Sequence, residues 1–219
     1  MVTLLGSAAI ATPSAVAGVP DSRSVPPTCA GIVVDGACAA PLAEQHATRA
    51  AVRRSGVTLV RRTFDWAEIE HTPGVLDFRL YDRFVREAAR AGLEIMPSVY
   101  GTPPWQDSRP AGNTLHGVYP PKDLAAFAAF ARAIVQRYGR GGSLWAEHPE
   151  VPARPIVNYQ VWNEPNLTIY WLPRIDPRAY TRLLSQTGAA IRSVDPAARI
   201  VLGGMPVASH LGAKLTDYL

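Results

Sequence analysis

The sequence predicts an α/β protein, a (β/α)8 (TIM) barrel truncated to about its first five β/α units. Short apolar segments alternate with longer amphipathic ones, which is typical of parallel strands joined by helical crossovers. No glycine-rich turn follows the first strand segment, and this argues against a dinucleotide-binding open sheet. Polar and aromatic residues directly follow the strand segments, where barrel enzymes build their active sites.

Five short segments are expected to form the strands, because they are apolar, brief and bounded by turn residues. They cover residues 31–34, 57–61, 94–99, 156–162 and 200–202. Four longer segments between them have helical character, with apolar residues on one side. They cover residues 42–55, 80–91, 123–138 and 176–193.

The helix boundaries carry their own signals. Gly56, Gly92 and Gly139 each follow a helical segment, and glycine is favoured just after a helix end. Asp176 and Pro177 open the last helical segment. Aspartate caps a helix N-terminus through its side-chain oxygen, and proline fits the first helical position.

The number of strands is smaller than a closed barrel requires. A (β/α)8 barrel has eight strands and typically about 250 residues, whereas five strand segments occur in these 219 residues. An open half-barrel would expose sheet edges and apolar faces, which single domains avoid. We therefore expect residues 29–219 to be the N-terminal part of a longer barrel.

Residues 1–28 are expected to be a signal-like leader and a linker. Residues 2–17 are apolar and small, and Ala15-Val16-Ala17 fits the cleavage pattern of a secretory signal. No Lys or Arg precedes this stretch, so the signal is incomplete and a disordered alanine-rich leader is the alternative. The stretch is too short to span a membrane. The pattern favours a secreted or extracellular protein with no membrane partner.

Charge and cysteine content narrow the possible partners. The net charge of +4 does not indicate a nucleic-acid partner, because the arginines are scattered and form no basic run. Cys29 and Cys38 have no histidine pair nearby, so neither a metal site nor a cofactor is predicted. Their pairing stays open: a turn at Asp35-Gly36 permits a disulfide in an exported protein, and two free thiols are the alternative.

The fourth strand segment ends on a candidate catalytic carboxylate. Because side chains alternate along a strand, Gln160, Trp162 and Glu164 are expected on the face toward the barrel interior. Glu164 then lies at the strand end among Trp162, Tyr170 and Trp171, in a partly desolvated setting. Desolvation favours the protonated carboxyl that a general acid needs. The alternative is a surface glutamate that caps the next loop.

Four stretches together resemble a known family, the retaining glycoside hydrolases with (β/α)-barrel folds. This clan includes the family-five cellulases and the family-thirty-nine xylosidases. The resemblance covers roughly residues 31–219, and the Trp-Asn-Glu-Pro-Asn run is its most specific part. The stretches follow the family's order and cover residues 60–78, 101–105, 162–166 and 201–204.

The resemblance implies roles for individual residues. Glu164 corresponds to the acid/base, Asn163 to the residue that bonds the sugar 2-hydroxyl, and Arg61 to the arginine that orients the nucleophile. For Arg61 the alternative is a strand-end ion pair. Four aromatic residues are candidate sugar-stacking platforms, with packing around the barrel rim as the alternative for each. They are Trp66, Trp105, Tyr170 and Trp171.

The implied function is hydrolysis of a β-linked poly- or oligosaccharide by a retaining, two-carboxylate mechanism, with a carbohydrate as the partner. Retention needs a second carboxylate about 5–5.5 Å from the first. The family carries it as a glutamate on the seventh strand, and no glutamate follows Glu164 here. The nucleophile is therefore expected outside these residues. The alternative is a catalytically inactive, carbohydrate-binding barrel fragment.

Overall fold

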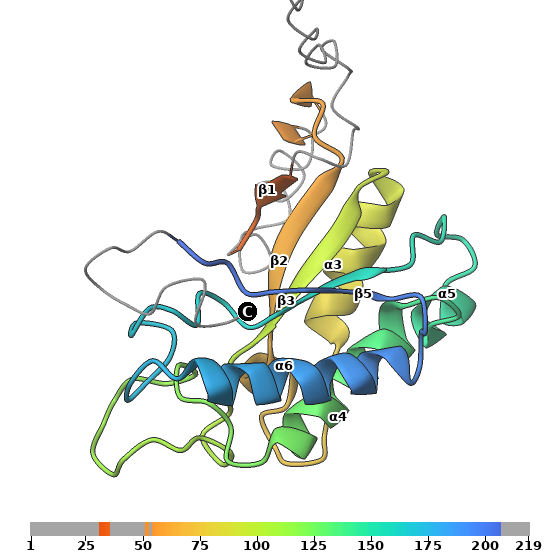
Figure 1. The fold of residues 1–219 in the computed structure, drawn as a ribbon. Helices are drawn as coiled ribbons and strands as arrows, with labels where there is room; N and C mark the ends of the chain where they lie inside the picture. Colours follow the sequence, from red (N-terminus) through yellow and green to blue (C-terminus); the bar gives the residue numbers. More distant parts are fainter. Residues whose placement is uncertain (1–30, 36–50, 53, 207–219) are drawn as a thin grey trace, which may run out of the picture.

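The computed structural model describes residues 31–35, 51–52 and 54–206, and these form one parallel sheet with helices along it (Figure 1). The leader, Cys29, Cys38 and most of the predicted helix 42–55 lie outside the described residues. The sheet order is β1-β2-β3-β4-β5, so each strand pairs with the next along the chain. The strands are β1 (Gly31–Val33), β2 (Leu59–Asp65), β3 (Glu94–Tyr100), β4 (Asn158–Val161) and β5 (Arg199–Val201).

Helical segments connect these strands, as expected for parallel neighbours. They are α2 (Trp66–Ile69), α3 (Arg79–Arg90), α4 (Leu124–Tyr138), α5 (Ser143–Glu147) and α6 (Pro177–Arg192). The predicted α/β class and its parallel strand order are confirmed. Within the described residues the sheet ends at β1 and β5 and does not close into a barrel.

The core lies between the sheet and the long helices. Phe64 of β2 is fully buried, and its ring contacts Tyr81 of α3 at 4.7 Å and Tyr138 of α4 at 5.7 Å between centroids. Further along the sheet, the Tyr180 hydroxyl of α6 donates to the carbonyl of Val161 at the end of β4. Alternate residues of the strands therefore face α3, α4 and α6, and the opposite face carries the residues discussed below.

The helix-boundary signals predicted at Asp176, Pro177 and Gly139 are present, and Asp123 is a further cap that was not predicted. Asp176 accepts a hydrogen bond from the Ala179 N–H, and Pro177 is the first residue of α6. Asp123 caps α4 in the same way through the Ala125 N–H, and Gly139 follows the last residue of that helix. These caps satisfy backbone donors that have no partner inside a helix.

All five strands differ from the sequence prediction by one to four residues at one or both ends, and two of these differences lie near the site. The predicted strand 57–61 extends to Asp65, because β2 pairs with β3 from Leu59↔Glu94 to Asp65↔Tyr100. Its charged residues resemble a loop in local composition, so only the pairing with β3 reveals the strand. The fourth strand ends at Val161, one residue before the predicted end. The short helices α2 and α5 were not predicted.

None of the described helices is both long and apolar enough to cross a membrane.

Candidate active site

Arg61 connects two strands on the face of the sheet opposite the helices. Its Nε donates to Gln160 Oε1 of β4 at 2.5 Å, and one terminal nitrogen donates to Asn163 Oδ1 at 2.7 Å. The other terminal nitrogen lies 3.9 Å from the Asp35 carboxylate, so an ion pair is present beside the hydrogen bonds. The structure thus brings Arg61 and Asn163 together on one face of the sheet.

Gln160 extends this network to the segment after β5. Its Nε2 donates to the carbonyl of Leu202 at 3.1 Å, and the side chain is 5% exposed. Both ends of the amide are therefore used, which satisfies a buried polar group. The sequence placed Gln160 on this face without a role, and the structure shows that it supports Arg61.

The contact with Arg61 determines how the Asn163 amide is oriented. A guanidinium only donates hydrogen bonds, so the atom that faces it must be the carbonyl oxygen Oδ1. The Nδ2 group is then directed away from Arg61. Asn163 therefore presents a donor to any group that binds at this end of the sheet.

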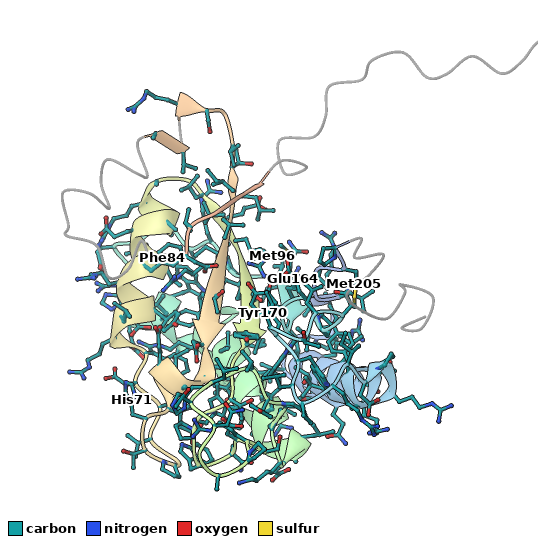
Figure 2. The ribbon with its side chains drawn as sticks, turned by 90° about the vertical axis from the view of Figure 1, so that its left-hand side faces the viewer. His71, Phe84, Met96, Glu164, Tyr170 and Met205 are labelled. Carbon is teal, nitrogen blue, oxygen red and sulfur yellow. The ribbon has the colours of Figure 1, made fainter. Side chains whose placement is uncertain are left out.

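Glu164 is partly buried at the turn that follows β4. Its carbonyl accepts a hydrogen bond from the Leu167 N–H at 2.9 Å, which closes the turn. Gly204, just after β5, lies beside it: a Cβ at Gly204 would be 3.7 Å from Glu164 Cγ. Figure 2 shows Glu164 in the same region as Tyr170 and Met205. We call the region around Arg61, Asn163 and Glu164 the mouth.

Trp162 does not lie on the face predicted for it. Its φ of 67° breaks the alternation of the strand, and its fully buried ring packs against Phe127 of α4 and against Trp171. The face predicted for Trp162 is therefore wrong, and Trp171 is buried beside it. Both indoles fill the layer between sheet and helices.

Trp66 and Trp171 are packing residues, so their prediction as sugar platforms is wrong. Trp66 is 0% exposed and stacks on Phe130 of α4 at 5.6 Å, while its Nε1 donates to the Glu70 carboxylate. Trp171 is 1% exposed and contacts Trp162 and Tyr180 edge-on. A stacking platform must present a ring face to its ligand, and neither ring is accessible.

The other two candidate platforms are partly exposed but lie in different places. Trp105 contacts Trp66 edge-on at 5.4 Å and lines a cavity of about 360 Å³ beside α4, together with Pro73 and Phe130. Neither Arg61 nor Glu164 lines this cavity, so the structure does not bring Trp105 to the mouth.

Tyr170 remains a candidate platform at the mouth. Its ring contacts Tyr100 of β3 edge-on at 6.2 Å, and its carbonyl accepts the Trp162 Nε1–H. It is partly exposed, and Figure 2 shows it near Glu164. Of the two candidates in the segment after β4, Tyr170 is the partly exposed one, and its role as a platform stays a prediction.

Asp65 is an ionisable group that the sequence prediction missed. It ends β2 on the same face as Arg61, opposite Tyr100 of β3. Burial raises its pKa to about 6, and the nearby Glu68 charge adds to this, whereas the hydrogen bond from the Ala67 N–H opposes it. The signal that could have found it is an aspartate before an amphipathic turn, because Asp65 caps α2.

Gly101 allows the Asp65 carboxylate to lie against β3. Its φ is 84°, and a Cβ there would be 2.6 Å from Asp65 Oδ1. Neither the backbone angle nor the space suits a side chain. Burial, and next the Asp65 charge, also raise the pKa of the Tyr100 phenol.

Arg61 of β2 and the residues Asn163 and Glu164 after β4 thus lie on one side of a parallel β/α sheet. In (β/α)-barrel enzymes the active site is built at the C-terminal ends of such strands. The scan of protein-family models matches none, and no curated protein matches this chain. Solved structures, however, do match this chain. The chain is 21% identical to the GH39 enzyme from Xanthomonas axonopodis pv. citri, with a TM-score of 0.60, over 78% of this chain and 34% of that one.

Two further solved structures have a similar fold. A family 39 glycoside hydrolase from Bacteroides cellulosilyticus WH2 is 19% identical over 80% of this chain and 31% of its own, with a TM-score of 0.55. The endoglucanase Cel5A from Thermotoga maritima is 17% identical over 79% and 47%, with a TM-score of 0.52. The predicted resemblance is thereby confirmed at the level of the fold. The chain spans about a third to a half of these proteins' lengths.

Proposed function

We propose that this chain is the N-terminal part of a (β/α)8-barrel glycoside hydrolase in which Glu164 is the catalytic acid/base. The observation that carries the proposal is the hydrogen bond from Arg61 to Asn163, the residue next to Glu164, at 2.7 Å. It joins β2 to the segment that follows β4, and barrel active sites are assembled from residues of several strands. The fold shared with solved glycoside hydrolases supports the same conclusion.

The proposed reaction has two steps. Glu164 first donates its proton to the glycosidic oxygen as the bond to the leaving group breaks, and the sugar becomes attached to a nucleophilic carboxylate. The ionised Glu164 then removes a proton from water, which attacks the sugar and releases it with retained configuration. The Asn163 Nδ2 group donates a hydrogen bond to the sugar 2-hydroxyl.

The nucleophile is proposed to come from a later strand of a longer polypeptide. Retention requires the second carboxylate about 5–5.5 Å from the first, and no glutamate follows Glu164 in these 219 residues. Within the described residues β5 is the last strand of the sheet, and its outer edge is where the next parallel strand of a barrel would pair. We further propose that the leader is a secretion signal, so that the substrate is an extracellular β-linked poly- or oligosaccharide.

The replacement of Glu164 by glutamine in the full-length protein tests this proposal. We expect hydrolysis of poorly activated aryl β-glycosides to fall about 10²–10⁴-fold, the usual contribution of general acid–base catalysis. Azide should restore turnover of activated substrates, because it attacks the intermediate without needing a general base. Steady-state kinetics with both substrate types measure this.

Glu68→Gln is the matched control, since this glutamate accepts a hydrogen bond from the Tyr81 hydroxyl and a glutamine oxygen can do the same. It should leave both rates nearly unchanged. Unaltered activity in E164Q would exclude Glu164 as the acid/base. Saturable oligosaccharide binding without any product in the wild type would instead support the inactive, carbohydrate-binding alternative.

A further inference from the structure

The turn after β4 is strained at two residues. Within the described part of the chain, Trp162 (φ 67°) and Glu164 (φ 39°) are the two non-glycine residues with positive φ. A side chain disfavours this left-handed region, and such residues persist where their surroundings over-determine them. The two strained residues lie on either side of Asn163 at the proposed site. Contacts with other residues must therefore hold them in this conformation.

Backbone and side-chain hydrogen bonds hold Trp162 in this conformation. Its N–H donates to the Val99 carbonyl at 2.8 Å, and its carbonyl accepts from the Ser98 hydroxyl at 3.3 Å. Its indole Nε1 donates to the carbonyl of Tyr170 at 2.8 Å. The residue is therefore tied to β3 through its backbone and to the loop after β4 through its side chain.

Aromatic packing holds the ring itself. The indole is 0% exposed and lies 4.8 Å from Tyr100, 5.9 Å from Phe127 and 5.4 Å from Trp171, measured between ring centroids. Large buried aromatic side chains contribute strongly to the stability of a core. The favourable packing of the ring thus offsets the unfavourable backbone conformation.

The turn exchanges the faces on which two residues lie. Strict alternation would place Trp162 beside Gln160 on the mouth side and Asn163 beside Val161 on the helix side. The structure shows the reverse: Trp162 packs against α4, and Asn163 accepts a hydrogen bond from Arg61 at the mouth. A regular strand would therefore separate Asn163 from Arg61.

We propose that Trp162 is a positioning residue of the acid/base site. By burying its ring behind β4 it turns Asn163 and Glu164 together toward the mouth, and the Tyr170 carbonyl locks that turn. The inference rests on the proposed function, since it names what orients Glu164. Trp162 acts through its two neighbours and does not contact the substrate.

Trp162→Phe in the full-length protein tests this role, because it keeps a ring and removes the donor to Tyr170. Only a poorly activated glycoside needs the proton of Glu164. We therefore expect kcat/KM to fall at least about tenfold more for phenyl β-glycosides than for 2,4-dinitrophenyl β-glycosides, because displacement of Asn163 affects both substrates whereas general acid catalysis aids only the poor leaving group. Trp162→Tyr serves as a second variant if the first does not fold.

Trp171→Phe is the matched control, since this indole is equally buried, contacts Trp162 and has negative φ. It should change both rates by the same factor. Equal losses on both substrates in W162F, or no loss, would overturn the positioning role, because they indicate a packing effect or none.

A second readout does not depend on activity. In ¹⁵N-labelled protein the side-chain amide signals of Asn163, identified by their disappearance in Asn163→Asp, should shift in W162F and remain in place in W171F. Unshifted signals in W162F would overturn the inference. If the wild type hydrolyses no glycoside, the proposed function fails, and these signals still decide whether Trp162 positions Asn163.

Discussion

The two faces of β2 differ in the kind of interaction they make. Phe64 faces α3 and α4, packs against the rings of Tyr81 and Tyr138, and is fully excluded from solvent. Arg61 and Asp65 face the mouth and make directional hydrogen bonds to other strands and to a helix end. One strand thus serves both the core and the proposed site. Changes on the two faces should separate stability from function.

The largest loss of stability is expected from a change on the helix-facing side of β2. Phe64→Ala should lower the free energy of unfolding by about 3–5 kcal/mol, because it removes a buried ring and leaves a cavity. Urea unfolding followed by circular dichroism measures the change. Phe64→Leu, which keeps most of the volume, should cost clearly less. If leucine costs as much as alanine, the loss comes from the ring contacts to Tyr81 and Tyr138 and not from a cavity.

A change at the mouth should raise, and not lower, the free energy of unfolding. The folded-state pKa of Asp65 is raised from 3.8 to about 6, so the folded protein binds the proton more tightly than the unfolded chain. Its contribution to stability is then lost as pH rises from about 4 to about 6. Asp65→Asn should remove this loss and stabilise the protein at pH 7 by up to about 3 kcal/mol.

The difference between wild type and D65N should vanish at about pH 3, where the wild-type carboxyl is protonated in both states. Thermal or urea unfolding across pH 3–7 measures this, and asparagine retains the cap of α2. Asp123→Asn repeats the exchange at the cap of α4, away from the mouth. A destabilised D65N at pH 7 would contradict the raised pKa.

The smallest effect concerns backbone strain at the mouth. Glu164 has a φ of 39°, where glycine is favoured over any residue with a Cβ. Glu164→Gly should therefore be more stable than Glu164→Ala by about 1 kcal/mol. Calorimetric unfolding of both variants gives the difference. A more stable alanine variant would show that the turn is not strained at this residue.

The elements of the fold were largely predictable because their signals are local. Residues 80–91 and 123–138 were predicted as helices, and α3 and α4 form over nearly the same residues. Asp176 and Pro177 predicted the start of α6 correctly, since a cap needs only its own first turn. The extension of β2 to Asp65 was missed, because it depends on pairing with β3.

The candidate site was predictable in part. The Asn-Glu-Pro run identified Glu164 and Asn163, and the structure places Asn163 against Arg61. Trp66 and Trp171 were predicted as platforms because an aromatic residue near a strand end suits either packing or stacking. Their burial depends on α4 and α6, which pack over them in three dimensions.

The sequence by itself determined the alternation of strands and helices, the caps of the helices, and the position of Glu164 at the end of a strand. Only the tertiary structure decided which residues face the mouth. Side-chain alternation holds while the backbone stays extended, and the left-handed Trp162 ends it. Contacts from Ser98, Val99 and Tyr170 hold that conformation, and such long-range contacts have no local signature in the sequence.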